Sequence, residues 1–428
     1  MGAIESIKYN YGFLRTLMGS GRERYFAATH TLVKIEKEYR QFKSDSKSYH
    51  SHDVEHELAK IHTKAASMVA NLCRENGAMW VKFAQFLSCR PDILPLQFIA
   101  PLQSLQCEAK SAHFEEIHPL IIESWGQSWD DHFRSFDAVP VATASVAQVH
   151  RAVLRSGQEV AVKLQLPNAR TYFEQDSLVF TTLARALGPL VKELDVQQVV
   201  AQLLSLTLEE LDFAREAENL RQFRSLAHLP GIVTPALVED LSGQKIMVTS
   251  WAEGTPLADY LRQNPDRAIP LLNRIQASYL QQITQLGVYH ADPHPGNFIV
   301  TENEDIVILD FGAICRLNHQ ERLNYTVLLL GIMGHHDIEL SELFSNAGFV
   351  CDRSETLQEI ADFVVGDNPE QLSVSERLRS SMDKLRKNRV KMPDSFVAMA
   401  RVIITIGGFL DQYDVDFLFE PAEFGVKG

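Results

Sequence analysis

The sequence has few cysteines, no long apolar run and no excess of positive charge, and each absence excludes a class of protein. The five cysteines form no CxxC pair, which is typical of neither a disulfide framework nor a zinc site. No uncharged stretch approaches the roughly 18 residues of a membrane span, and Arg401 interrupts the most apolar segment, residues 396–410. The net charge of −14 disfavours a surface that wraps nucleic acid.

The overall composition indicates an ordinary folded protein. A length of 428 residues favours two or three packed units, and 45% hydrophobic with 22% charged residues is close to the globular average. The N-terminus lacks the charged, apolar and small-residue segments of a signal peptide. We therefore expect a cytoplasmic protein that is not secreted, has no transmembrane helix and binds no nucleic acid.

The spacing of apolar residues predicts an α+β fold that begins with helices. Residues 4–42 and 54–120 carry three- and four-residue apolar steps, and residues 168–226 do so again. Two β-hairpins are predicted, each with a Ser-Gly-Gln turn: residues 146–154 with 159–166, and residues 232–238 with 245–251. These changes of pattern predict a helical N-terminal extension (1–130), a small lobe of antiparallel sheet with inserted helices (131–252) and a mostly helical larger lobe (253–428).

Basic side chains gather in two segments of this acidic chain. One is the amphipathic stretch at residues 4–24, and the other covers residues 376–391. Each segment suits either a solvated helix face or contact with an anionic membrane surface. Peripheral contact with the inner face of a membrane is the sharper expectation, and the solvated face remains its alternative.

The strongest chemical signal is the run HADPHPGN at residues 290–297, followed by DFG at residues 310–312. The prolines and the glycine predict a fixed loop, and a short buried strand brings in Asp310. Oxygen atoms of Asp292, Asn297 and Asp310 suit magnesium bound together with phosphates. In phosphoryl transfer the first aspartate orients the attacking group, while the asparagine and the second aspartate hold metal.

A strand lysine completes this pattern. The run EVAVKL places Lys163 on the second strand of the first predicted hairpin, where its amine can reach the α- and β-phosphates. Such a lysine needs a carboxylate partner on a helix, and residues 208–217 (LEELDFAREA) offer several. The order of these elements along the chain, more than any one of them, indicates an ATP and Mg²⁺ site.

With these motifs the chain resembles the UbiB (AarF) family of atypical, protein-kinase-like proteins linked to coenzyme Q biosynthesis, from about residue 78 to 317. Residues 82–92 (KFAQFLSCRPD) resemble the family's KxGQ helix and its SxRPD continuation, with Ala84 in place of the expected glycine. Residues 141–150 (VATASVAQVH) resemble the family's alanine-rich loop. Because each Cβ limits close backbone approach, we expect nucleotide in a different pose from that in ordinary kinases.

The resemblance implies a two-lobed kinase-like fold and assigns roles to single residues. It makes Glu216 the partner of Lys163, and it makes a regulatory lid from Lys82 and Gln85 with the ExD motif, whose acidic residues are Glu210 and Asp212. Nucleotide contacts are expected from the alanine-rich loop, the strand lysine and the linker after residue 247: Ala142, Thr143, Ala144, Ser145, Val146, Lys163, Val248, Ser250 and Trp251. Trp251 is equally suited to a place in the core.

Two absences lead to the predicted activity. Ala291 stands where phosphorylation-regulated kinases have an arginine, and no APE motif follows Asp310. We expect an ATPase, or a kinase acting on a small lipid-like molecule, that supports ubiquinone biosynthesis and does not phosphorylate peptides. Its expected partners are a lipid or quinone precursor and quinone-biosynthesis proteins.

Two alternatives remain open. One is a nucleotide-gated scaffold or lipid-binding chaperone with negligible turnover. The other is a metallohydrolase that would use two sets of metal ligands: His290, Asp292 and His294, and the run His335-His336-Asp337.

Overall fold

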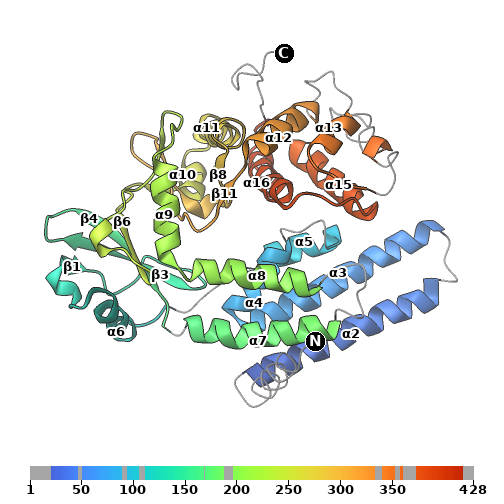
Figure 1. Cartoon of the computed structure of the whole chain (residues 1–428), viewed down its shortest axis with the longest axis horizontal. Helices are drawn as coiled ribbons and strands as arrows, with labels where there is room; N and C mark the ends of the chain where they lie inside the picture. The colour runs from blue at the N-terminus through green and yellow to red at the C-terminus, as the bar shows by residue number, and fades with distance from the viewer. Residues whose placement is uncertain are drawn as a thin grey trace. The chain divides into compact units, whose positions relative to one another are not determined.

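The computed structural model of the chain (Figure 1) describes residues 21–46, 51–88, 94–105, 111–167, 169–187, 196–332, 340–351, 357–359 and 373–417. Its helices and sheets confirm the predicted α+β class. Two compact units are found. The first unit is Met1–Gly157, Val162–Asp212 and Gln244–Ile246, and the second is Gln158–Ala161, Phe213–Gly243 and Met247–Gly428. The predicted boundaries at residues 130 and 252 stay a prediction.

The first unit is built on a helical core. Its helices are α2 (Gly21–Asp45), α3 (Ser51–Asn76), α4 (Ala78–Ser88), α5 (Leu96–Gln103), α6 (Phe114–Trp125), α7 (Ala169–Leu187) and α8 (Val196–Glu210). Figure 1 shows α7 and α8 side by side, and α3 packs on α2, α4 and α5. All of these helices except α6 contribute to one apolar cluster that contains Ala66, Trp80 and Val179. Burial of this shared surface stabilises the helices of the N-terminal extension.

One ion pair crosses that helical core. Arg24 of α2 donates to Asp176 of α7 at 2.5 Å, and the indole N–H of Trp80 in α4 lies 3.3 Å from the same carboxylate oxygen. Asp176 is only 2% exposed. Burial raises the pKa of its carboxyl, and Arg24 and Trp80 act in the opposite direction. The pair therefore fixes the register of three helices.

A five-stranded sheet follows the helical opening. Its strands are β1 (Phe133–Phe136), β2 (Ala142–Thr143), β3 (Ala147–Leu154), β4 (Glu159–Gln165) and β6 (Ile246–Ser250), in the order β1-β3-β4-β6 with β2 on β3. The first predicted hairpin is thus confirmed as β3 and β4. Along β4, Val160, Val162 and Leu164 are fully buried, so the alternation of the strand turns Lys163 to the opposite face.

The second predicted hairpin is wrong in its first strand. β5 covers only Ile232–Val233 and pairs in parallel with β10 (Ile306–Ile308), whereas the predicted second strand forms β6 beside β4. Only an isolated bridge joins Leu237 to Thr249. Pro235 explains the difference, because proline has no N–H to donate to a strand ladder.

After the short segment Gln158–Ala161, the second unit continues with α9 (Phe213–Arg224) and is mostly helical. One sheet has the order β5-β10-β9-β7, with β9 at Phe298–Val300 and β7 at Thr255–Pro256, and a separate pair joins β8 (Val288–His290) to β11 (Ile314–Arg316). The later helices are α10 (Leu257–Gln263), α11 (Ala268–Gln281), α12 (His319–Ile332), α13 (Leu340–Asn346), α15 (Val374–Lys387) and α16 (Asp394–Asp411). In Figure 1 α15 and α16 lie together near the C-terminal end of the chain, and they pack on each other.

None of the helices that the structure describes combines the length and the apolar character needed to cross a membrane. The most apolar predicted segment lies in α16, whose middle carries Arg401. The basic stretch at residues 376–391 lies in and just after α15, while residues 4–20 of the N-terminal basic segment are outside the described residues.

The ion pair of the helical core makes a testable prediction. Arg24→Met should lower the free energy of unfolding at about pH 7 by about 3 kcal/mol, because it leaves a buried carboxylate unpaired. In the Arg24→Met variant the pKa of Asp176, already raised by burial, should rise further. The loss of unfolding free energy should therefore shrink as the pH falls through the pKa of Asp176 in the variant, because the carboxyl is then protonated. Denaturant unfolding at about pH 7 and about pH 5 measures both effects. Adding Asp176→Asn should restore part of the stability, and a loss that is the same at both pH values would contradict this account.

Candidate functional site

The strand lysine is tied to the ExD segment within the first unit. Lys163 is half-buried in β4, between the fully buried Val162 and Leu164. Two residues later the side-chain amide of Gln165 donates to the carbonyl of Leu211, the middle residue of the ExD motif. The strand that carries the lysine and the acidic motif therefore hold each other in place.

Lys82 links the KxGQ-like helix to two other predicted site elements of the same unit. Its ammonium forms an ion pair with Glu210 and lies 3.5 Å from the hydroxyl of Ser145 in the alanine-rich loop. Ala84 is 0% exposed and belongs to the helical core, so the methyl group that replaces the family's glycine is accommodated by packing. Gln85 faces a different neighbour, because its amide donates to the carbonyl of Leu105 at 3.0 Å.

The structure describes only part of the segment that follows the KxGQ-like helix. Arg90, Pro91 and Asp92 of the SxRPD continuation lie outside the described residues. Asp212 follows α8 and precedes α9, and its backbone N–H donates to the carbonyl of Glu209.

The alanine-rich loop is a tight hairpin. Ala142 pairs with Val149 and Thr143 with Gln148, and the N–H of Ala144 donates to the carbonyl of Ala147 at 2.7 Å. Residues 145 and 146 therefore form the tip. The short pairing and the side chains at the tip leave less room for close backbone approach to a phosphate than a glycine-rich loop would.

Two buried polar side chains under this hairpin were not predicted. The Gln148 amide accepts from the N–H of Ala112 at 2.8 Å and contacts the carbonyl of the same residue at 3.2 Å. His150 contacts the carbonyl of Asp137 through Nδ1 at 2.7 Å and the Gln148 amide through Nε2 at 2.9 Å. Since a carbonyl only accepts, Nδ1 carries the proton, and burial lowers the pKa of His150. The sequence did carry a signal for these two residues, because Gln148 and His150 occupy alternate positions of a mostly apolar strand and therefore share one face of it.

The second unit brings Asp292 and Asn297 together. The amide nitrogen of Asn297 donates to the backbone carbonyl of Asp292 at 3.1 Å and to its carboxylate at 2.9 Å. The Asn297 amide oxygen is therefore turned away from Asp292, as a metal ligand requires. Asp292 itself is exposed, so its second carboxylate oxygen is accessible to a reacting group.

His290 braces this loop and is 0% exposed. Its Nε2 lies 2.6 Å from the backbone carbonyl of Asp310, so Nε2 carries the proton. Nδ1 then accepts from the hydroxyl of Tyr279 at 3.1 Å. His294 has a similar internal contact, because its Nδ1 accepts from the N–H of Gly296 at 3.1 Å. Both nitrogens of His290 are used by the protein, which argues against a metal-ligand role.

The metallohydrolase alternative gains no support from the part of the chain that the structure describes. No three His, Cys, Asp or Glu side chains gather there in a way that could hold a metal ion. The run His335-His336-Asp337 lies outside the described residues.

Asp310 has an unusual backbone conformation. Its φ of 52° lies in the left-handed region, which is costly for a residue with a side chain. The N–H of Gly312 donates to its carboxylate at 3.0 Å, and the N–H of Leu309 donates to the carbonyl of Asn297 at 2.8 Å. These bonds hold the turn, and they leave the Asp310 carboxylate exposed next to the loop that carries Asn297.

Helix α9 binds the residue after Asp310 at both of its backbone polar groups. The carboxylate of Glu216, which is 6% exposed, accepts from the N–H of Phe311 at 3.3 Å. Asn219, one turn later, donates to the carbonyl of Phe311 at 3.0 Å. Arg316 then donates to the side chains of Asn219 at 3.1 Å and Gln222 at 2.6 Å. The helix with Glu216 and the DFG turn are therefore coupled, and Asn219 was not predicted although it shares a helix face with Glu216.

The linker residues predicted to contact the nucleotide donate their backbone N–H groups to other groups of the protein. Val248 donates to the Ser242 hydroxyl at 3.0 Å, Ser250 to the carbonyl of Ala236 at 2.7 Å and Trp251 to the carbonyl of Glu159 at 3.0 Å. The next N–H, that of Ala252, makes no hydrogen bond to another described residue. A base that bonds to this linker would therefore use Ala252.

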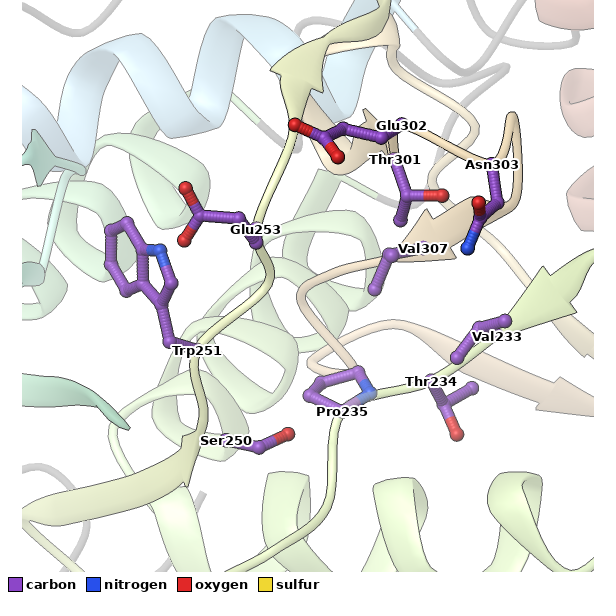
Figure 2. Close-up of a pocket in the computed structure, with 10 residues that line it drawn as sticks. All are labelled: Val233, Thr234, Pro235, Ser250, Trp251, Glu253, Thr301, Glu302, Asn303 and Val307. Carbon is purple, nitrogen blue, oxygen red and sulfur yellow. The ribbon is translucent and has the colours of Figure 1, made fainter. Parts of the chain in front are cut away.

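Figure 2 shows a pocket of about 310 Å³ beside the linker. Its lining is Val233, Thr234, Pro235, Ser250, Trp251, Glu253, Thr301, Glu302, Asn303 and Val307. Trp251 and Glu253 stand on one side and Thr301 and Asn303 on the other. None of the predicted metal-binding or catalytic residues lines it, so this hollow is separate from the acidic turns.

A lysine on a strand, a helix carboxylate bound to a DFG turn and an HxDxxxxN loop define the protein-kinase-like class. The profile described as ABC1 atypical kinase-like domain matches residues 104–343, which is more than half of the chain. The chain belongs to this family, and the resemblance to UbiB (AarF) proteins and the kinase-like fold are thereby confirmed.

Individual relatives agree with this assignment. A protein of Clostridium pasteurianum, described as an uncharacterized protein in the hydrogenase 1 5' region, is 28% identical over 78% of this chain and 65% of its own length. AarF domain-containing protein kinase 1 of Mus musculus is 30% identical over 65% of this chain and 54% of its own length. A solved structure of Rv3197 from Mycobacterium tuberculosis in complex with erythromycin has a TM-score of 0.53 at 28% identity and covers 77% of this chain and 87% of that one.

The chain thus spans less than two thirds of the clostridial and mouse proteins.

The coupling of α9 to the DFG turn is testable. Asn219→Ala removes the bond to the Phe311 carbonyl, worth about 1 kcal/mol, and should speed amide hydrogen exchange across residues 311–313 by about fivefold. Gln222→Ala is the matched control, because it removes side-chain contacts to Arg316 and Glu218 but no bond to Phe311. Mass-spectrometric exchange on both variants measures the difference. Equal exchange in the two variants would show that Asn219 does not hold the turn.

Proposed function

We propose that this protein binds Mg-ATP and either hydrolyses it or transfers its terminal phosphoryl group to a small lipid-like acceptor, in support of isoprenoid quinone synthesis. The observation that carries the proposal is the arrangement of Asp292, Asn297 and Asp310 around the buried His290. The side chains of Asn297 and Asp310 bond to backbone groups, and the Asp292 carboxylate accepts from the Asn297 amide. His290 joins the two turns through the backbone carbonyl of Asp310. Preorganised oxygen ligands of this kind are what phosphoryl transfer requires.

Each residue has a proposed role. Lys163, with Glu216 as its carboxylate partner, positions the α- and β-phosphates. The amide oxygen of Asn297 and the carboxylate of Asp310 hold Mg²⁺, which neutralises phosphate charge when bound. Asp292 accepts a hydrogen bond from the attacking water or hydroxyl and orients it. The bond from Asn297 to the Asp292 carboxylate keeps that side chain in a single direction.

The nucleotide contacts follow from the hairpin and the linker. Residues 142–146 lie over the phosphates, with Ser145 at the tip of the turn. Val248, Ser250 and Trp251 are proposed as the neighbours of the base. Because the N–H groups of these three residues are already bonded, the direct bond to the base is proposed for Ala252.

Lys82, Gln85, Glu210 and Asp212 are proposed as a lid that excludes peptides. The ion pair of Lys82 with Glu210 and its approach to Ser145 support this role, since one ammonium connects the lid helix to the nucleotide loop. A small acceptor also agrees with the mycobacterial neighbour, which is described in complex with erythromycin. We place the protein in the cytoplasm with peripheral contact to a membrane that holds quinone precursors and their biosynthetic proteins.

The same lid contact favours one second candidate. A lysine that holds the nucleotide loop would suit a nucleotide-gated scaffold or lipid-binding chaperone in which hydrolysis is slow and the bound state is the output. The scaffold differs from the enzyme in whether catalysis is needed for the cellular effect.

Nucleotide binding is tested first. Isothermal titration with ATP should detect binding that requires Mg²⁺, and Asp310→Asn should weaken it at least about tenfold, because it removes the negative charge of one metal ligand. Lys163→Met should weaken binding as well, whereas Lys245→Met, a surface lysine paired with Glu123, should not. Binding that is indifferent to Mg²⁺, or equal losses in both lysine variants, would refute the proposed site.

Catalysis is tested with a second pair of variants, one at the proposed catalytic aspartate and one at a control aspartate. Asp292→Asn should lower ATP turnover at least about 100-fold with little change in ATP affinity, as expected for a group that acts on the attacking atom. Asp240→Asn, an exposed aspartate of the same unit, should leave turnover unchanged. Purified protein should also fail to label a broad peptide library.

Complementation separates the two candidate functions. A deletion strain should show an altered isoprenoid quinone profile that the wild type restores and Asp292→Asn does not. Full restoration by a variant without turnover would favour the scaffold, and an unchanged profile in the deletion strain would remove the quinone assignment.

A further inference from the structure

Helix α16 of the second unit carries one cation in an apolar sequence. Between its terminal aspartates the only charged residue is Arg401. The neighbours Ala400, Val402 and Ile403 are buried, and Arg401 itself is partly buried. A charge at such a position lowers stability relative to an apolar side chain unless it is paired or hydrogen-bonded. Its presence therefore needs an explanation from what the guanidinium touches.

The guanidinium touches the catalytic loop. Nη2 of Arg401 donates to the backbone carbonyl of Ala291 at 2.7 Å, across 110 positions of sequence. Ala291 directly precedes Asp292 and is itself buried. Arg401 also opposes the effect of burial, which raises the pKa of Tyr289 in β8. The cation therefore lies beside both the strand that enters the loop and the peptide bond that leads into Asp292.

That peptide bond is held on both sides. Its carbonyl, from Ala291, accepts from Arg401, and its N–H, from Asp292, points to Nδ1 of His290 at 3.4 Å. The N–H of Ala291 in turn donates to the carbonyl of Ala313 at 2.8 Å, next to the DFG turn. Because a peptide unit is planar, fixing its two polar groups fixes the position of the Asp292 Cα. The bond from the Asn297 amide then orients the Asp292 carboxylate.

We propose that Arg401 is the positioning residue of the catalytic loop, and that it sets the orientation of Asp292 by holding the carbonyl of Ala291. This inference rests on the proposed function, because it concerns the residue that orients the attacking group. It also bears on regulation. Ala291 carries no cation, and residues 311–319 contain no serine, threonine or tyrosine, so Arg401 braces the loop without a phosphorylated residue in that segment.

The kinetic test compares three variants of the full-length protein. Arg401→Met should lower kcat for ATP turnover about 10- to 100-fold with KM for ATP nearly unchanged, because the loop is misplaced while the nucleotide contacts remain. Arg401→Lys, which keeps a charged donor, should recover part of the loss. Ile403→Ala is the structural control. It removes buried volume from the same helix and keeps the bond from Arg401 to Ala291, so it should lower the melting temperature but leave kcat of the folded protein near the wild-type value.

A second readout does not depend on activity. Arg401→Met should raise amide hydrogen exchange across residues 290–297, and Ile403→Ala should raise it less there than in α16 itself. If the wild type turns over no ATP but this exchange difference appears, the proposed function fails and the loop-positioning role stands. If the wild type is active and neither kcat nor loop exchange responds to Arg401→Met, the inference is overturned. Should Arg401→Met not fold, Arg401→Lys and Arg401→Gln are read by the same two criteria.

Discussion

The buried imidazole of His290 is the contact on which the acidic turns depend. It donates to the carbonyl of Asp310 and accepts from Tyr279, so it joins the turn with Asp292 to the turn with Asp310. A carbonyl buried near the strained backbone of Asp310 needs a donor, and the imidazole supplies it from a position that water does not reach. The side chain of His290, which is fully buried, therefore fixes the position of the two turns relative to each other.

Distant helices complete the arrangement by bonding to backbone groups. α9 binds the N–H and the carbonyl of Phe311, and α16 binds the carbonyl of Ala291 through Arg401. Side chains that hold backbone amides fix the direction of the neighbouring carboxylates without occupying the space in which a ligand would bind. The exposed carboxylates of Asp292 and Asp310 thus sit on a rigid base, which is the condition for electrostatic preorganisation.

Local sequence patterns predicted several of the strands and the loop at residues 290–297. The alternation around Lys163 and the apolar run before Asp310 gave correct strands, and the motif at residues 290–297 gave the braced loop. The second hairpin failed at Pro235, because a β-rich composition does not reveal that a missing N–H diverts β5 to β10. Gln148, His150 and Asn219 escaped notice, because a polar residue on a strand or helix face reads as solvated until the element that covers it is known.

The sequence by itself determined the family and named the candidate site residues. The order of the strand lysine, the helix carboxylate and the two oxygen-rich turns is local information, and short motifs carry it in full. Only the tertiary structure decided which residues hold those motifs still. Asn219 and Phe311 are 92 positions apart and Arg401 and Ala291 are 110 apart. Such pairs arise from packing of the whole second unit, and no periodicity along the chain encodes them.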